Sequence, residues 1–205
     1  MIQFLEQINF DSGLEFFAAV LGVLSAWYAK KNKILVYPTG LISTLIYVLI
    51  LFKNKFLGDL IINVYFFLMS IYGWFFWSRK DEGIIKNKIS RLNLNESIFG
   101  IIIFIFGFII VMFFYNISNW KESHVSLIDT LTTAIFCSAM WFMARRKIEH
   151  WMLWIIGDII SVPLYIYKGL FFTSIQYVIF TFIAILGFIT WLKELNKKKL
   201  IVKEL

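Results

Sequence analysis

Long apolar runs separated by short polar segments make up most of the sequence. Four runs contain no charged residue, and three more are interrupted by a single acid, Glu15, Asp129 or Asp158. The seven runs cover residues 13–29, 34–52, 60–78, 97–120, 125–144, 151–167 and 169–192. Each reaches the length of about 17–25 residues that a helix needs to cross ~30 Å of hydrocarbon. Because a spanning segment must satisfy its own backbone hydrogen bonds and barrel-type alternation is missing, we predict an all-α membrane protein with seven transmembrane helices in one domain, residues 1–205.

The pattern of helices and turns repeats once along the chain. At an offset of about 115 residues, the basic ends of the first and fifth helices coincide. With one residue fewer in the second outer turn, Gly73 and Trp77 also match Gly187 and Trp191. The alternative is that loop charges match only because membrane topology requires it. The matched Gly and Trp positions favour a true internal repeat.

This repeat predicts a 3+1+3 architecture. Repeat one covers about residues 13–78, repeat two about 125–192, and a linker helix at about 96–116 joins them. The offset spans four helices, an even number, so both repeats cross the membrane in the same direction, as in transporters of the SWEET type. The linker helix is apolar all round, which is typical of a helix that faces lipid.

Basic residues flank the predicted helices asymmetrically. Of the 20 Lys and Arg residues, Lys53, Lys55, Lys121 and Lys168 lie on one side and the remaining sixteen on the other. Basic loops favour the cytoplasm, so we expect the N-terminus outside and the C-terminus inside. The net charge of +7 is then a topology signal that also allows contacts with anionic lipid, and it gives no reason to expect nucleic acid.

One face of the sixth helix concentrates polar and aromatic side chains. Trp151, Trp154, Asp158, Ser161 and Tyr165 recur at spacings of three and four. An ionised Asp near the bilayer centre costs about 2.5–3.5 kcal/mol on insertion scales, so such residues usually face a bundle interior or a substrate path. The alternative is that Asp158 only ties helices together.

Other helices carry similar stripes, which could converge with the first on one wet cavity. They include Thr44 and Tyr47, Asn63 with Phe66 or Phe67, Asp129 and Thr133, and Gln176 with Phe180. For any single polar residue, the alternative is an interhelical hydrogen bond of about 0.6 kcal/mol.

The tryptophans divide by depth. We expect Trp77, Trp141 and Trp191, near the cytoplasmic ends, to be interfacial anchors, whereas Trp151 could belong to the interface or to the site. Trp154 lies one turn deeper and is the better candidate to stack on a flat cationic ring.

Catalytic and cofactor signatures are missing from the sequence. There is no phosphate-binding loop, dinucleotide fingerprint or HExxH motif, and Cys137 is the only cysteine. His124 and His150 fall on opposite sides of the predicted membrane, too far apart for one metal site. We therefore predict no enzyme activity, no catalytic residue, no metal and no cofactor.

The segments WMLWIIGDIISVPLYIYKGLFFTSIQYVIF and YPTGLISTLIYVLILFKNKFLGDLIINVYFFLMSIYGWFFW carry a resemblance to a known family. Over nearly its whole length, the chain resembles the PnuC family of nicotinamide riboside transporters. The resemblance implies facilitated diffusion of the vitamin, made effectively one-way by a cytoplasmic kinase. It also implies that neighbouring residues from several helices line the binding site. Carried onto matching positions, they are Trp154, Asp158, Asn63, Gln176 and neighbouring aromatics, and the resemblance implies a bacterial inner membrane. Together with the polar stripes described above, the expected substrate-binding residues are Trp154, Asp158, Asn63, Gln176, Trp151, Tyr47, Thr44, Ser161, Tyr165, Phe67 and Tyr177.

Several alternatives stay open at this point. Thiamine, also a flat cation, and riboflavin are carried by relatives with similar motifs. A proton-coupled carrier that uses Asp158 and a membrane receptor or scaffold without transport are further candidates. The sequence also leaves homo-oligomerisation open.

Overall fold

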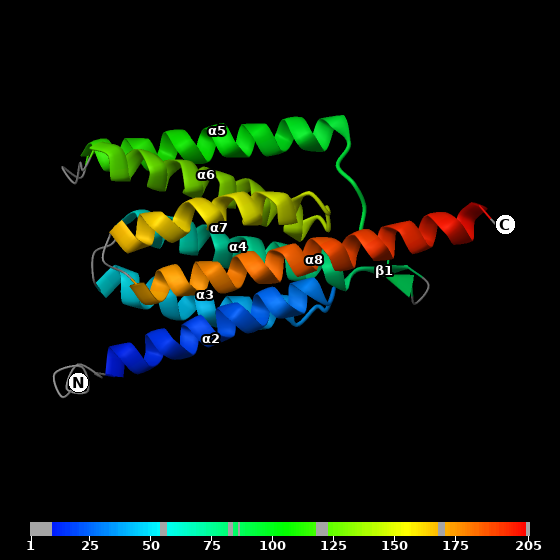
Figure 1. The fold of residues 1–205 in the computed structure, drawn as a ribbon, viewed down its shortest axis with the longest axis horizontal. Helices are drawn as coiled ribbons and strands as arrows, with labels where there is room; N and C mark the ends of the chain where they lie inside the picture. Colours follow the sequence, from blue (N-terminus) through cyan, green and yellow to red (C-terminus); the bar gives the residue numbers. More distant parts are fainter. Residues whose placement is uncertain are drawn as a thin grey trace.

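The computed structural model describes residues 10–53, 57–81, 84–85, 87–117, 123–167 and 171–203. Within them the chain forms a bundle of seven helices (Figure 1). The helices are α2 (Phe10–Lys30), α3 (Val36–Lys53), α4 (Leu57–Ser78), α5 (Leu94–Ile117), α6 (Ser123–Ala144), α7 (His150–Tyr167) and α8 (Phe171–Lys203). Five of them are long and apolar enough to cross a membrane, and α2 and α3 contain shorter apolar segments, Phe16–Lys30 and Val36–Ile50. The predicted all-α membrane fold is confirmed.

The helices pack as two groups of three. In the first group α2 packs on α3 and α3 on α4, and in the second α6 packs on α7 and α7 on α8. The groups meet along α4 with α6 and along α2 with α8. α5 lies at the edge of the bundle against α6, with few contacts to α4 (Figure 1). As expected for a helix that faces lipid, only Gly100 and Val111 of α5 are buried.

Two turns at the same end of the bundle share an unusual backbone geometry. Asn32 after α2 and Arg146 after α6, 114 residues apart, have φ values of 52° and 55°. The N–H groups of Asn32 and Arg146 donate to carbonyls three residues earlier, and those of Lys33 and Lys147 donate to carbonyls five residues earlier. This pair of hydrogen bonds is the Schellman motif, which ends a helix. Arginine in this left-handed region costs roughly 1–2 kcal/mol. Its guanidinium offsets part of that cost by donating to the Asn87 carbonyl at 2.6 Å.

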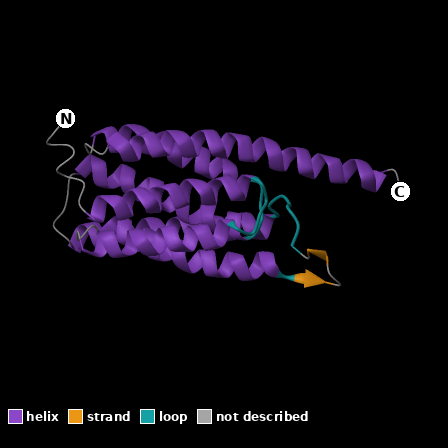
Figure 2. Cartoon of the chain, turned by 90° about the horizontal axis from the view of Figure 1, so that it is seen from below, coloured by secondary structure: helices purple, strands orange, loops and turns teal. Residues whose placement is uncertain are grey.

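The segment between α4 and α5 differs from a plain loop. It starts with a two-stranded hairpin, β1 (Lys80–Asp81) and β2 (Ile84–Ile85), which was not predicted (Figure 2). Residues 87–93 then cross the end of the bundle, where the Ser90 backbone pairs with Arg146 and Ile148. Ile89 in this segment is 4% exposed and packs into the core.

The last helix is longer than predicted. The apolar run ends at residue 192, but α8 continues to Lys203 and projects from the bundle (Figures 1 and 2). Residues 193–203 contain no glycine or proline and are rich in lysine, so they extend the helix beyond the apolar span. The end of α8 and the start of α2 lie at opposite ends of the bundle, because seven helices cross it an odd number of times.

The outer turns with Lys55, Lys121 and Lys168 lie outside the described residues.

Candidate functional site

The polar stripe of α7 faces the interior of the bundle. Trp151, Asp158, Ser161 and Tyr165 are all buried, and Trp154 between them is half-buried. The opposite face of the helix carries exposed Met and Ile side chains. The spacing of three and four therefore places these five side chains on one inward surface.

Asp158 and Ser161 contribute polar atoms that the described part of the chain leaves unpaired. Asp158 is 1% exposed and Ser161 is fully buried. Asp158 Oδ1 and Ser161 Oγ have no hydrogen-bond partner among the described residues. An unsatisfied buried polar group costs about 1–3 kcal/mol, and more when it is charged. Such an arrangement points to a ligand that supplies the missing contacts.

An aromatic layer from four helices includes Trp154, which lies on the same face of α7 as this pair. Trp154 stacks on Phe136 of α6, with ring centroids 5.2 Å apart and planes at 27°. Phe136 in turn stacks on Tyr177 of α8, and Tyr177 on Tyr165, at 6.0 Å and 5.0 Å. Phe66 of α4 closes the group, 5.8 Å from Trp154. The layer offers stacked faces of the kind that bind flat rings and cations.

Phe136 was not among the predicted site residues. It reaches α7 because Gly157 has no side chain: a Cβ added there would lie 2.3 Å from Phe136 Cε1. The signal was present in the sequence, since Phe136 follows Thr133 by three residues on the same helical face. The glycine opposite, which admits the ring, could not be paired with it from sequence alone.

The remaining predicted residues lie on neighbouring helices. Gln176 lies where α8 meets α2, since a Cβ added at Gly22 would be 3.8 Å from its Nε2 atom. Thr44 donates within its own helix, to the Gly40 carbonyl at 2.9 Å. The other three, Tyr47, Asn63 and Phe67, are half-buried. The structure thus brings Trp154, Tyr165 and Tyr177 into one ring cluster, with Asp158 and Ser161 on the same face of α7. Whether these residues bind substrate stays a prediction.

The prediction that Trp77 and Trp191 are interfacial anchors is wrong. They are 2% and 0% exposed. Each indole N–H instead donates to a backbone carbonyl of the other helix group, Trp77 to Ala144 and Trp191 to Ala29, both at 3.1 Å. These hydrogen bonds explain the burial, because an indole N–H needs a partner away from water. Trp151 joins the same cluster, edge-on to Trp191 at 5.7 Å.

Asp129 and Thr133 of α6 lie near α5 and near the cavity between α4, α5 and α6. Asp129 accepts a hydrogen bond from the Tyr115 hydroxyl of α5. Thr133 lines a cavity of about 460 Å³ between α4, α5 and α6. Their contribution to a central cavity stays a prediction.

The chain matches the sequence model of one known family. Residues 12–193 match the family described as nicotinamide mononucleotide transporter.

No group of three or more His, Cys, Asp or Glu side chains suited to a metal ion occurs within the described ranges.

Individual relatives agree with this match. The chain is 26% identical to the nicotinamide riboside transporter PnuC of Escherichia coli K12, over 91% of this chain and 88% of that protein. It is 21% identical to the riboflavin/roseoflavin transporter RibM of Streptomyces davaonensis, over 84% and 81% of the two chains. A crystal structure of the vitamin B3 transporter PnuC superposes with a TM-score of 0.70 at 23% identity, covering 92% of this chain and 84% of the other. That structural likeness establishes the fold.

Proposed function

The chain belongs to the nicotinamide mononucleotide transporter family, and we propose that it carries nicotinamide riboside across the bacterial inner membrane by facilitated diffusion. It is a multi-pass membrane transporter rather than an enzyme. The observation that carries the substrate proposal is that the buried acid Asp158 shares a face of α7 with Trp154, whose ring stacks on Phe136. Nicotinamide riboside has a flat cationic ring, a carboxamide and ribose hydroxyls. The ring suits the aromatic faces and the acid Asp158, and the Ser161 hydroxyl can bond to the carboxamide or the ribose.

Charge favours the riboside over the mononucleotide. None of the seven apolar runs contains Lys or Arg, and α7 contributes one acid, Asp158, to the interior. A phosphate on the substrate would meet no basic partner in the spans and would be repelled by the carboxylate. The positively charged riboside has no such conflict.

The same argument supports a role for a cytoplasmic kinase. A passive carrier only equilibrates its substrate, so net uptake requires that the substrate be consumed inside the cell. Phosphorylation adds negative charge, and the acidic interior then disfavours return of the product. We propose that intracellular phosphorylation is the trap.

We propose that α7 and α3 are equivalent central helices of two repeats, about residues 13–78 and 125–192, joined by a linker at about 96–116. Both groups pack their helices in the same order, and they meet through equivalent pairs, α4 with α6 and α8 with α2. Gly73 lies against Tyr37, and 114 residues later Gly187 lies against Trp151. An added Cβ would come within 2.4 Å of a Tyr37 atom and 2.5 Å of a Trp151 atom. Two such halves, related by an axis along the membrane normal, could rock around a site between them.

We propose that the end with the Asn32 and Arg146 turns is cytoplasmic. The basic turns after α2 and α6, residues 87–93 and the lysine-rich end of α8 all lie at that end. The positive-inside rule then places the N-terminus outside and the C-terminus in the cytoplasm.

Binding by purified protein tests the substrate. Thermal unfolding in detergent would be followed with nicotinamide riboside, nicotinamide mononucleotide, thiamine and riboflavin. The proposal expects the largest stabilisation with the riboside, because a ligand that binds only the folded state raises its stability. Stabilisation by riboflavin or thiamine alone would reassign the transporter to that vitamin.

Asp158 also supports one rival function, proton-coupled transport, because a buried carboxylate can carry a proton. Uptake into proteoliposomes under an imposed pH gradient separates the two. Facilitated diffusion expects the same rate with and without the gradient, whereas coupling expects the gradient to drive accumulation.

A further inference from the structure

A groove opens on the side of the bundle between α4, α5 and α6. It lies where α5 leans on α6 and barely touches α4, and it has a volume of about 460 Å³. Its walls include Ile61, Met69, Tyr72, Phe99, Ile103 and Trp141, and none of the described lining residues is charged. The volume falls in the range of about 300–1,000 Å³ typical of small-molecule sites. Tyr65, Tyr72 and Thr133 bring hydroxyls to the groove, but most of its walls are apolar, which suits a hydrocarbon chain better than a polar vitamin.

The length of the groove matches one leaflet of a bilayer. On α5 it runs from Phe99 to Val111, twelve residues, or about 18 Å at 1.5 Å per residue. On α4 it runs from Ile61 to Tyr72, about 16 Å by the same rise. Half of a hydrocarbon core of ~30 Å is about 15 Å. A groove of this length accommodates one acyl chain lying along the helices.

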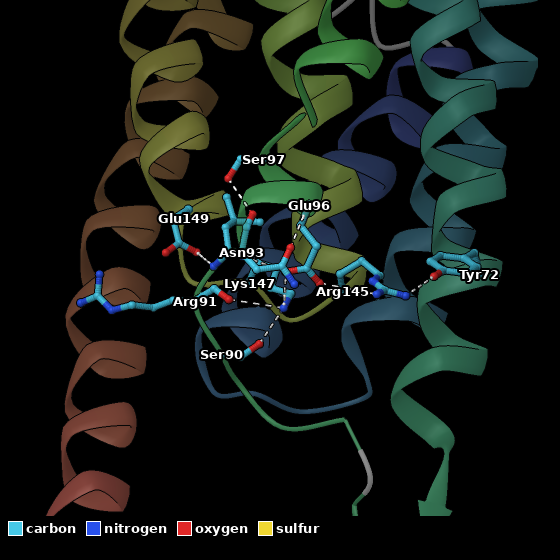
Figure 3. Close-up of polar contacts among 10 residues, drawn as sticks. Tyr72, Ser90, Arg91, Asn93, Glu96, Ser97, Arg145, Lys147 and Glu149 are labelled. Atoms are coloured by element: carbon cyan, nitrogen blue, oxygen red, sulfur yellow. Dashed lines mark hydrogen bonds and ion pairs between the residues drawn. The ribbon is translucent and has the colours of Figure 1, made fainter. Parts of the chain in front are cut away.

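A basic side chain stands at one end of the groove. Arg145 donates to the hydroxyl of Tyr72 at 3.3 Å (Figure 3). Its guanidinium lies 5.9 Å from the ring centroid of Trp141. Tyr72 and Trp141 both line the groove. The Arg145 side chain is 33% exposed, so it is open to a ligand from the membrane surface.

The charge around Arg145 is not fully balanced. The nearest acid, Glu96, is shared with Lys147, which approaches to 2.7 Å, whereas Arg145 lies 3.5 Å away (Figure 3). Two cations and one carboxylate leave a net charge of +1. A guanidinium with spare N–H groups is well suited to bind phosphate.

We propose that this groove binds an anionic glycerophospholipid, with one acyl chain along α4 and α5 and its phosphate on Arg145. The lipid comes from the cytoplasmic leaflet, a placement that rests on the proposed orientation. Lipid tails surround the groove at its depth in the bilayer, and the basic end selects for an anionic headgroup.

Native mass spectrometry of the full-length protein tests the proposal. The wild type would be titrated with phosphatidylglycerol and with phosphatidylcholine carrying identical chains. We expect tighter binding of phosphatidylglycerol, and a loss of about fivefold in Arg145→Gln, the factor that corresponds to about 1 kcal/mol for one basic side chain near an anionic surface. Binding of phosphatidylcholine should change little in that variant.

Two further variants complete the design. Ile103→Trp fills the groove and should weaken both lipids, and Lys193→Gln removes an exposed cation elsewhere and should weaken neither. Equal affinity for the two lipids in the wild type, or unchanged phosphatidylglycerol binding in both Arg145→Gln and Ile103→Trp, would overturn the proposal. The proposal would also be overturned if the wild type formed oligomers and Ile103→Trp dissociated them. That result would mean that a second copy of the chain, and not a lipid, occupies the groove. Lipid adducts are read by mass without substrate, so the result is independent of whether nicotinamide riboside is transported.

Discussion

Replacing Asp158 with asparagine removes the acid that α7 places inside the bundle while keeping its shape. Asp158 and Trp154 are four residues apart, so they are separated by about 6 Å along the helix axis. A cationic ring stacked on Trp154 would lie at roughly that distance from the carboxylate. With an effective dielectric constant of about 20, the attraction is on the order of 3 kcal/mol. Asp158→Asn should then weaken nicotinamide riboside binding by up to about 100-fold.

The folded protein should tolerate this change. Asp158 Oδ1 has no hydrogen-bond partner among the described residues, so no contact of that atom is lost. We expect an unfolding temperature equal to or above that of the wild type. Riboflavin carries no cationic ring, so any riboflavin binding should not weaken in the same way.

Isothermal titration of detergent-solubilised protein measures the effect, with Asp129→Asn as the matched control. Asp129 is also buried in a span, but it accepts a hydrogen bond from Tyr115 on the α5 side. An amide oxygen can still accept that bond, so the control should bind as the wild type does. If proton and ligand compete for Asp158, wild-type affinity also falls as pH is lowered between about pH 8 and pH 5. Wild-type affinity in Asp158→Asn, together with affinity that is flat across this range, would refute the electrostatic role.

Three other predictions address the ring, the packing and the topology. Trp154→Ala should weaken nicotinamide riboside binding roughly 30-fold, because a desolvated cation–π contact contributes about 2 kcal/mol. The control Trp27→Ala removes a partly exposed indole on α2 and should leave the affinity measured by titration unchanged. Equal losses in the two variants would make Trp154 a packing residue. Gly187→Ala should lower the free energy of unfolding by about 1–3 kcal/mol in thermal unfolding, because the new Cβ would overlap Trp151. The control Gly13→Ala should not lower it, because no atom lies within 4 Å of a Cβ added there. A Gly187→Ala variant as stable as the wild type would contradict the close packing. A reporter that is active only in the periplasm should be silent when fused after Leu205, and its activity there would reverse the proposed orientation.

The inward face of α7 could be predicted because it depends on local spacing. Residues at intervals of three and four share a face whatever the rest of the fold does, and the cost of a buried acid indicates which way that face points. The peripheral position of α5 follows from a similar argument, since a helix with almost nothing polar between Phe99 and Phe114 can face lipid on every side.

Features that depend on partners far apart in the chain could not be predicted. Trp77 and Trp191 occupy the depth of interfacial anchors, and only the fold shows that each donates to a carbonyl of the other helix group. The hydrogen bond that Asp129 accepts from Tyr115 depends on how α5 packs on α6. Phe136 entered the site through the missing side chain of Gly157, a contact between two helices that periodicity alone does not pair.

Counterflow in proteoliposomes tests the transport claim most directly. Vesicles with purified protein would be loaded with unlabelled nicotinamide riboside and diluted into labelled substrate. We predict that label accumulates transiently inside the vesicles. Excess nicotinamide riboside should abolish this accumulation, nicotinamide mononucleotide should leave it largely intact, and an imposed pH gradient should not change it. Label uptake no greater than in protein-free vesicles, from protein that elutes as a folded species, would contradict the proposal that this chain carries nicotinamide riboside.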